Sequence, residues 1–231
     1  MIKKHMPNAL TCFNLLSGCI GITFAFSGDL NIAVMFIWIG GVFDFLDGFV
    51  ARMLKVSSAI GQQLDSLADM ITFSLLPAII MYHFMLGVAP EEYLSYFAFL
   101  LAVFSALRLA KFNIDERQSD VFYGLPTPAM ALFISAFPYI LKENPAQTGE
   151  ILTNFWALAM ITILLSALMV ADIKLLALKF KGFQWNRNMM RYLLIMASVL
   201  LIIWLKLAAL PLIIIFYVIL SMSNNYLEKS V

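Results

Sequence analysis

The sequence predicts an all-α fold, a polytopic membrane helix bundle with about eight transmembrane helices. The chain of 231 residues is 62% hydrophobic, with a mean hydropathy of +0.90, which is more apolar surface than a soluble domain of this length needs. Long apolar runs recur along the whole chain, and short stretches with charges or helix breakers separate them. No internal repeat is visible, so we expect one integral-membrane domain over residues 1–231.

Each expected helix is an apolar run between polar or helix-breaking residues. Ser27–Asp29 separate the first helix from the second, the stretch 55–61 separates the second from the third, and Lys206 marks the turn before the last. Gly40 and Gly41 in the second run are expected packing positions. The eight expected helices cover residues 10–27, 31–53, 63–87, 92–113, 126–142, 151–172, 189–206 and 208–226.

The basic residues predict the orientation of the bundle. All but two of the 15 Lys and Arg residues fall at helix ends on the same side as the N-terminus, and the exceptions are Lys142 and Lys206. Because basic residues are enriched on the cytoplasmic side of membrane proteins, we place the N-terminus there. We therefore expect a protein of the inner, cytoplasmic membrane whose functional site faces the cytoplasm.

Residues 44–69 hold four acids in an otherwise apolar stretch. A carboxylate within the membrane costs about 2.5 kcal/mol or more on insertion scales, so four of them indicate a function. Two lie three residues apart near the end of the second expected helix, and two lie four apart near the start of the third. Each pair shares a helix face, and the two faces can meet across an antiparallel helix pair. The full pattern, D-x2-D-G-x2-A-R-x8-G-x3-D-x3-D, is formed by Asp44, Asp47, Gly48, Ala51, Arg52, Gly61, Asp65 and Asp69.

This pattern suits hard metal ions and a diphosphate. Oxygen ligands favour Mg²⁺ or Mn²⁺, and four carboxylates are enough for two ions about 3.5–4 Å apart. Gly48 and Gly61 leave the backbone open to a bulky ligand, and Ala51 keeps the same face narrow. Arg52 offers a fork of donors to phosphate oxygens. The alternative is that the acids pair with Arg52 and Lys55 and that the glycines are packing positions.

In this pattern the chain resembles the CDP-alcohol phosphotransferase family, whose signature it matches at every fixed position. The resemblance implies a six-helix core, here followed by two further helices, and transfer from a CDP-linked donor to an alcohol with release of CMP. The implied metal ligands are Asp44, Asp47, Asp65 and Asp69, the last also serving as general base, and the implied nucleotide and diphosphate site is Gly48, Ala51, Arg52 and Gly61.

Residues 7–15 resemble the start of the family's first helix, which lies near the nucleotide. We therefore expect Asn8, Thr11 and Asn14 to hydrogen-bond to cytosine or ribose. A helix cap with a buried turn is the alternative, and for Thr11 it is equally supported.

Residues 108–113 and 124–128 resemble the phosphatidylserine synthase branch of the family. Arg108 and Lys111 are suitable partners for the carboxylate of serine, and Asn113 and Thr127 can add hydrogen bonds. The alternative for the two basic residues is anchoring at the cytoplasmic face and contact with lipid headgroups.

The implied function is transfer of a phosphatidyl group from CDP-diacylglycerol to L-serine, giving phosphatidylserine and CMP. Asp69 would deprotonate the serine hydroxyl, and displacement would be direct, because the pattern holds no Ser, Cys or His nucleophile. One alternative is a different acceptor, glycerol 3-phosphate or an inositol phosphate, whose dianionic phosphate favours more arginines nearby. Another is a cation transporter, whose acids are expected near the midplane. A purely structural scaffold has the least support.

The expected cofactors are two divalent cations, Mg²⁺ or Mn²⁺. The expected partners are CDP-diacylglycerol, serine and membrane lipids. A homodimer is compatible with the sequence, and no nucleic acid is expected.

Overall fold

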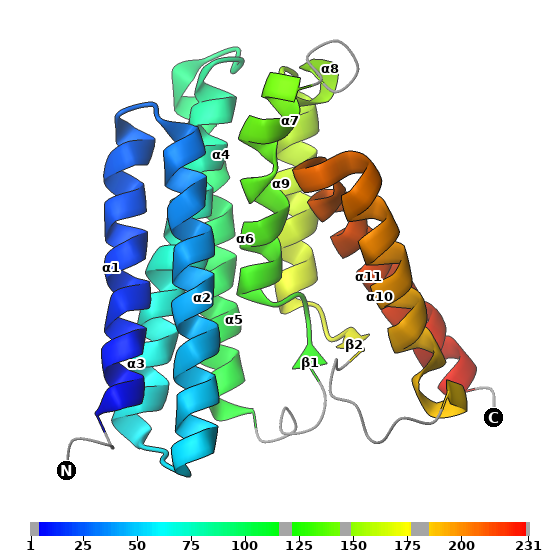
Figure 1. Cartoon of the computed structure of the whole chain (residues 1–231). Coiled ribbons are helices and arrows are strands. Elements are labelled where there is room, and N and C mark those ends of the chain that lie inside the picture. The colour runs from blue at the N-terminus through cyan, green and yellow to red at the C-terminus, as the bar shows by residue number, and fades with distance from the viewer. Residues whose placement is uncertain (1–4, 116–121, 144–148, 177–184, 230–231) are drawn as a thin grey trace.

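The computed structural model describes residues 5–115, 122–143, 149–176 and 185–229. In these ranges the chain is a bundle of helical rods that run between two ends of the molecule, as Figure 1 shows, and the expected all-α membrane bundle is confirmed. The rods are α1 (Met6–Phe26), α2 (Leu30–Leu54), α3 (Ala59–Asp69) continued by the π-helical turn η2 (Met70–Leu75) and α4 (Leu76–Leu86), η3 (Glu92–Phe99) continued by α5 (Leu100–Ile114), α6 (Thr127–Ser135) with α7 (Phe137–Glu143), α9 (Phe155–Val170), α10 (Trp185–Leu205) and α11 (Ala209–Lys229).

These rods correspond to the eight expected helices. Five continuous helical stretches are long and apolar enough to cross a membrane, and α9 is a shorter apolar helix. The last of the five stretches contains both α10 and α11, which meet at the short η5 (Lys206–Ala208). Lys206 has a φ of 51° and so makes the turn that the sequence predicts at this point.

Several helix boundaries differ from the expected ones for local reasons. The turn between α2 and α3 is shorter than the expected 55–61, because the Ser58 hydroxyl accepts a hydrogen bond from the Gly61 N–H at 3.0 Å and so starts α3 early. The fifth rod is interrupted before Pro138, which cannot donate a helical hydrogen bond. The sixth rod begins at Phe155 because Asn154 caps it, and the preceding residues form the separate α8 (Gly149–Leu152).

A two-residue antiparallel ladder was not expected. The strand β1 (Phe122–Tyr123) precedes α6, the strand β2 (Lys174–Leu175) follows α9, and the two pair with each other. Gly124 has a φ of 74°, and a Cβ at this position would lie 2.3 Å from the Met169 carbonyl oxygen, so only glycine fits here. The ladder therefore ties the start of α6 to the end of α9, at the end of the bundle where Asn113 of α5 is hydrogen-bonded to Ser66 of α3 (Figure 1).

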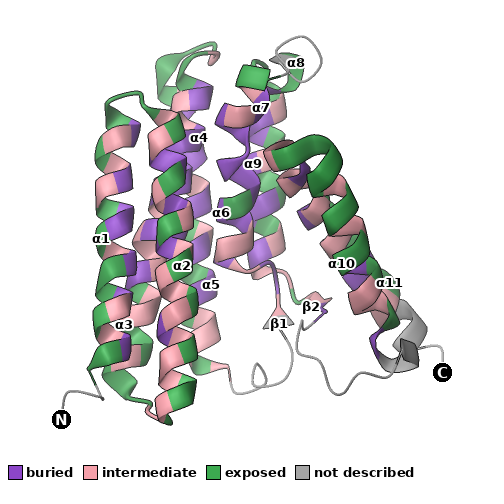
Figure 2. Ribbon diagram, viewed as in Figure 1, coloured by how far each residue is buried: buried purple, intermediate pink, exposed green. Residues whose placement is uncertain are grey.

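The interior of the bundle is centred on α4, whose side chains from Leu76 to Met81 are all buried. Figure 2 shows buried residues concentrated on α4, α6 and α9, whereas α1, α2 and the α10–α11 pair expose broad apolar faces. Exposed apolar faces on outer helices are what a surrounding lipid phase requires. The pair α10–α11 lies at the edge of the bundle and is the least buried of the candidate spans.

Candidate active site

The four acids of the motif gather where the end of α2 faces α3. Oxygens of Asp44, Asp47 and Asp65 all lie within 4.8 Å of one another. Asp69, one turn beyond Asp65, interacts with Asp44 at the inner side of this group. Among the described side chains, no salt bridge joins any of the four acids to a lysine or arginine. The acids therefore form no direct ion pair with Arg52 or Lys55, although the charge of Arg52 acts on Asp47. The close carboxylates repel one another unless a cation or a shared proton lies between them.

Helix α1 supplies one hydrogen bond to each end of this acid cluster. The Thr11 hydroxyl lies 2.6 Å from Asp47 Oδ2, and Asn14 Nδ2 donates to Asp69 Oδ1 at 3.4 Å. Both α1 residues are buried, and so is Asp47, which is only 7% exposed. Thr11 and Asn14 are three residues apart and so share the face of α1 that meets the acids. In this structure they brace carboxylates, and the nucleotide contacts expected of them stay predictions.

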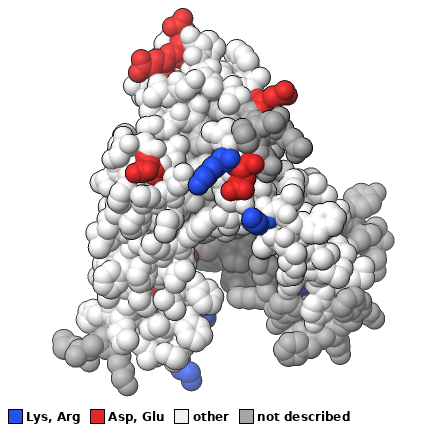
Figure 3. All heavy atoms as spheres, turned by 45° about the horizontal axis from the view of Figure 1, so that its top comes forward, with Lys and Arg blue, Asp and Glu red and all other residues white. Residues whose placement is uncertain are grey.

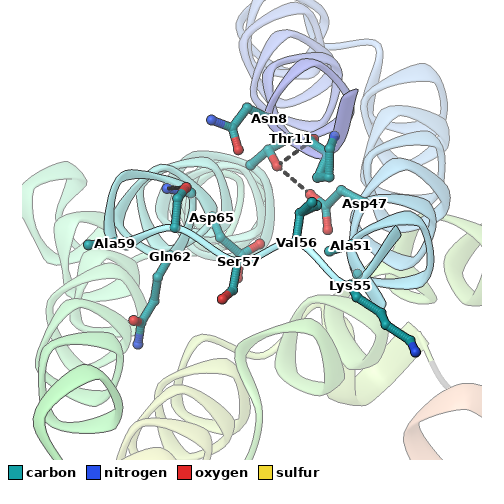
Figure 4. A pocket seen from close by; sticks show the side chains of 14 residues that line it. Asn8, Thr11, Asp47, Ala51, Lys55, Val56, Ser57, Ala59, Gln62 and Asp65 are labelled. Atoms are coloured by element: carbon teal, nitrogen blue, oxygen red, sulfur yellow. Dashed lines mark hydrogen bonds between the residues drawn. The ribbon is translucent and has the colours of Figure 1, made fainter. Parts of the chain in front are cut away.

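An open pocket of about 840 Å³ lies directly over the cluster. Figure 4 shows Asp47 and Asp65 reaching into it from α2 and α3, with Asn8 and Thr11 on the α1 side and Lys55 extending outward from the acids. Its walls include five of the residues expected at the nucleotide and diphosphate, namely Asn8, Thr11, Gly48, Ala51 and Gly61. Arg52, Asn14, Asp44 and Asp69 do not line this pocket.

The two glycines of the motif allow close approach on both sides of the pocket. A Cβ on Gly48 would come within 3.3 Å of a terminal nitrogen of Arg52, so the missing side chain lets this exposed guanidinium lie back over α2. A Cβ on Gly61 would lie 2.9 Å from the Ser58 hydroxyl and 3.0 Å from Asn8 Oδ1. Gly61 therefore also serves the helix cap and the contact between α3 and α1, beside the ligand role expected of it.

The four residues expected at the acceptor are not equivalent in the structure. Arg108 is 7% exposed, and Asp69 is the acid that interacts electrostatically with its guanidinium. Asn113 Nδ2 donates to the Ser66 hydroxyl of α3 at 2.9 Å, next to Asp65 in the chain.

The other two acceptor candidates have different surroundings. Lys111 forms a 2.7 Å salt bridge with Asp172 and stays 42% exposed, so its charge is already engaged at the edge of the bundle. Thr127 is completely buried at the start of α6, and its hydroxyl has no hydrogen-bond partner in the described part of the chain. Within the described residues, Arg108 interacts with Asp69 of α3 and Asn113 is hydrogen-bonded to Ser66 of α3.

Sequence reasoning missed the turn that closes the pocket. Lys55, Ser57, Ser58 and Gln62 all contribute to its walls. Ser58 was detectable, because a serine three residues before Gly61 at the start of an apolar run is a helix-capping signal. Lys55 adopts a left-handed conformation with a φ of 53°, which no simple pattern indicates. Which residues of such a turn line the pocket depends on the path of its backbone in three dimensions.

Comparisons with known proteins point to the same family as the acidic motif. The sequence model of the CDP-alcohol phosphatidyltransferase family matches residues 4–170. A CDP-diacylglycerol–serine O-phosphatidyltransferase of Helicobacter pylori (strain ATCC 700392 / 26695) is 32% identical over 204 residues, covering 85% of this chain and 81% of that protein. The Bacillus subtilis (strain 168) protein of the same name is 34% identical over 173 residues, covering 74% and 89%. An archaetidylserine synthase of Methanothermobacter thermautotrophicus is 31% identical over 175 residues, covering 73% and 68%.

Proposed function

Because this chain belongs to the CDP-alcohol phosphatidyltransferase family, we propose that it is an integral-membrane enzyme that transfers the phosphatidyl group of CDP-diacylglycerol to L-serine. The products are phosphatidylserine and CMP. The names of all three relatives include serine, whereas the lipid part of the name differs in the archaeal protein. This agreement supports serine as the acceptor more strongly than it supports any particular lipid donor.

The observation that carries the proposal is the cluster of Asp44, Asp47 and Asp65, of which Asp47 and Asp65 line the pocket. Its oxygens lie within 4.8 Å of one another, and no salt bridge joins them to a lysine or arginine of the described residues. A three-carboxylate donor set without sulfur or imidazole fits a hard divalent cation, for which we propose Mg²⁺ or Mn²⁺. Asp69 would complete the ligand set for a second ion. When bound, the cations would offset the negative charge of the acids and of the diphosphate.

The chain's own residues account for the remaining steps. The Arg52 guanidinium lies beside Gly48, a residue of the pocket wall, and would bind a diphosphate oxygen from there. Asp69 would accept the proton of the serine hydroxyl. The serine oxygen would then form a bond to the phosphorus that carries diacylglycerol, while the bond from that phosphorus to the CMP oxygen breaks. Asn14 holds the Asp69 carboxylate by its 3.4 Å hydrogen bond.

The position of the acids argues against the cation transporter. Asp47 lies in the last turns of α2 and Asp65 in the first turns of α3, next to the turn that joins them, so the pocket opens at one end of the bundle. A transport path is expected to place its acids near the midplane. A dianionic acceptor such as glycerol 3-phosphate would favour several arginines near the site. Among the described residues Arg108 is the one buried arginine, which favours serine over such an acceptor.

The test is an acceptor panel with the purified, reconstituted protein. CDP-diacylglycerol is supplied with Mg²⁺ or Mn²⁺ and with labelled L-serine, glycerol 3-phosphate or inositol phosphate, and the release of CMP and the lipid product are both measured. We expect serine to be the preferred acceptor. Preference for glycerol 3-phosphate would overturn the serine assignment and leave only the family.

The same assay tests the cation requirement. After chelation we expect no turnover, and we expect Mg²⁺ or Mn²⁺ to restore it, because no salt bridge within the described residues takes the place of a cation at the four acids. Full turnover in the chelated protein would contradict the proposed metal site. Unchanged thermal unfolding of the chelated protein would show that the loss is not unfolding.

A further inference from the structure

The turn between α2 and α3 holds a lysine in a backbone conformation that favours glycine. Lys55, directly after α2, has a φ of 53°, and among the described residues Lys206 is the only other non-glycine residue with a positive φ. A side chain in this left-handed region crowds the backbone, so helices that end in this way usually carry glycine there. Non-glycine residues in such conformations cost stability and cluster at functional sites. The lysine at this point therefore indicates a role for its side chain.

Two backbone hydrogen bonds hold Lys55 in this conformation. The Lys55 N–H donates to the Arg52 carbonyl at 3.2 Å, and the Val56 N–H donates to the Ala51 carbonyl at 3.0 Å. These bonds satisfy carbonyls at the end of α2, and the chain then continues to Ser58, which caps α3. The ends of both helices thus fix the position of the Lys55 backbone.

Lys55 also lines the pocket over the acid cluster. The α2 side of the wall is formed by Asp47, Gly48 and Ala51, and Lys55 follows them at the end of the helix. Among the described residues that line the pocket, Lys55 is the only one with a positively charged side chain, and it is exposed. Figure 4 shows this side chain extending away from Asp47 and Asp65, and it forms no salt bridge with a described acid. Its ammonium is therefore available to a ligand.

A phosphate of the donor is the anion that this ammonium is best placed to bind. A lysine is a compact charge on a flexible stem and commonly binds phosphate oxygens. Gly48 and Ala51, expected at the diphosphate, lie two turns and one turn before Lys55 on the same side of α2. None of the four residues expected at the acceptor lines this pocket, which favours the donor over serine as the ligand of Lys55.

We propose that Lys55 is a donor-binding residue, whose ammonium binds a phosphate oxygen of the CDP-linked lipid. The inference rests on the proposed function and adds to it a residue from the gap between Arg52 and Gly61, which the acidic motif leaves unspecified. The alternative is that Lys55 only stabilises the C-terminal end of α2, as basic residues at this end of a helix do. The two roles differ in outcome, because loss of the alternative role lowers stability and leaves donor binding unchanged.

The first test replaces the lysine by the residue that its backbone favours. Lys55→Gly removes the ammonium and relieves the left-handed conformation together. We expect the KM for CDP-diacylglycerol to rise about 3- to 10-fold, the range for one hydrogen bond, with an unchanged KM for serine and a melting temperature no lower than that of the wild type. The matched control is Lys206→Gly, which makes the same change at a φ of 51° outside the pocket and should alter neither KM.

Two further variants separate the charge from the backbone. Lys55→Asn removes the charge with a residue that tolerates the left-handed region, so it should raise the donor KM as Lys55→Gly does. Lys55→Arg keeps a cation that binds phosphate and should stay near the wild-type values. Each KM is measured in non-ionic detergent, with the donor as the only anionic lipid, and again in anionic liposomes.

A rise of the donor KM in both media, restored by Lys55→Arg, is the expected result. A rise confined to anionic liposomes would assign Lys55 to lipid headgroups, and a rise of the serine KM would assign it to the acceptor. Unchanged KM values would leave only the role at the helix end. Each of these three outcomes overturns the inference and leaves the proposed function standing. A wild-type protein that releases no CMP from CDP-diacylglycerol would overturn the proposed function, and this inference with it.

Discussion

Asp69 differs from the other three acids in the residues that surround its carboxylate. Its carboxylate accepts a hydrogen bond from Asn14 and interacts electrostatically with Arg108, which come from α1 and α5. Asp44, Asp47 and Asp65 instead face one another closely enough to share a cation. On the proposed function, Asp69 would accept a proton, and the three clustered acids would be metal ligands.

Replacing the two acids of α3 by asparagine tests these roles. Asp69→Asn keeps the shape of the side chain and removes the base, so the rate of CMP release should fall on the order of 10²–10⁴-fold. Asp65→Asn should abolish turnover through loss of a ligand. Both proteins should elute and unfold like the wild type. Asp29→Asn, an exposed acid in the α1–α2 turn, is the matched control. A near wild-type rate for either α3 variant would show that its assigned role is wrong.

At the scale of elements, the acids are positioned by the close packing of α1, α2 and the rod that contains α3. The π-helical turn η2 follows Asp69 directly, and its Thr72 donates to the Asn14 carbonyl at 2.9 Å. Such turns are frequent at functional sites, because they shift the helical register locally. A Cβ on Gly40 would lie 2.4 Å from Thr72 Cγ2, so the packing role expected for this glycine is supported.

Adding one methyl group at Gly40 should therefore displace the acid cluster. Thr72 is fully buried and β-branched, so it cannot rotate away, and Gly40→Ala should destabilise the fold by about 1–3 kcal/mol. Because Asp44 is one turn further along α2, CMP release should also fall. Gly41→Ala is the control, since its Cβ would meet the Phe73 ring at 3.8 Å, an ordinary contact. Thermal unfolding and initial rates measure both effects, and equal behaviour of the two variants would refute this account.

At the scale of the whole molecule, charge is distributed unequally between the two ends of the bundle. Arg52, Lys55 and Lys174 lie at the end that holds the acid cluster. Figure 3 shows acidic side chains on the opposite end, where the structure places the turn before α2, the start of η3 and the helices α7 and α8. This asymmetry agrees with the orientation predicted from the basic residues, in which the pocket opens toward the cytoplasm.

Cysteine labelling in intact bacterial cells tests that orientation. After Cys12 and Cys19 are replaced by alanine, a cysteine is introduced at Ser27, in the α1–α2 turn, or at Ser57, in the α2–α3 turn. A membrane-impermeant maleimide should label Ser27→Cys in intact cells and Ser57→Cys only after permeabilisation. Retained CMP release by both proteins is the control for folding. The reverse pattern would place the pocket on the outer side.

The sequence by itself determined the class of fold, the number of helices and the family. Membrane helices are visible in sequence because each must satisfy its backbone hydrogen bonds internally and cover about 20 residues with apolar side chains. The acidic motif is equally visible, since its gaps are short and place the acids on known helix faces. The helix boundaries were predicted less accurately. Ser58 and Asn154 cap α3 and α9, and these caps set where the two helices begin.

Only the tertiary structure decided how the helices are rotated and packed against one another. It directed Thr11 and Asn14 toward acids, and it buried Arg108 while pairing Lys111 with Asp172. It also brought the Tyr217 hydroxyl of the last helix to the Leu176 carbonyl. These contacts join residues far apart in the chain and depend on distances of a few tenths of an ångström between helices. Hydrophobic periodicity states which face of a helix is buried, but not which side chain of another helix it will meet.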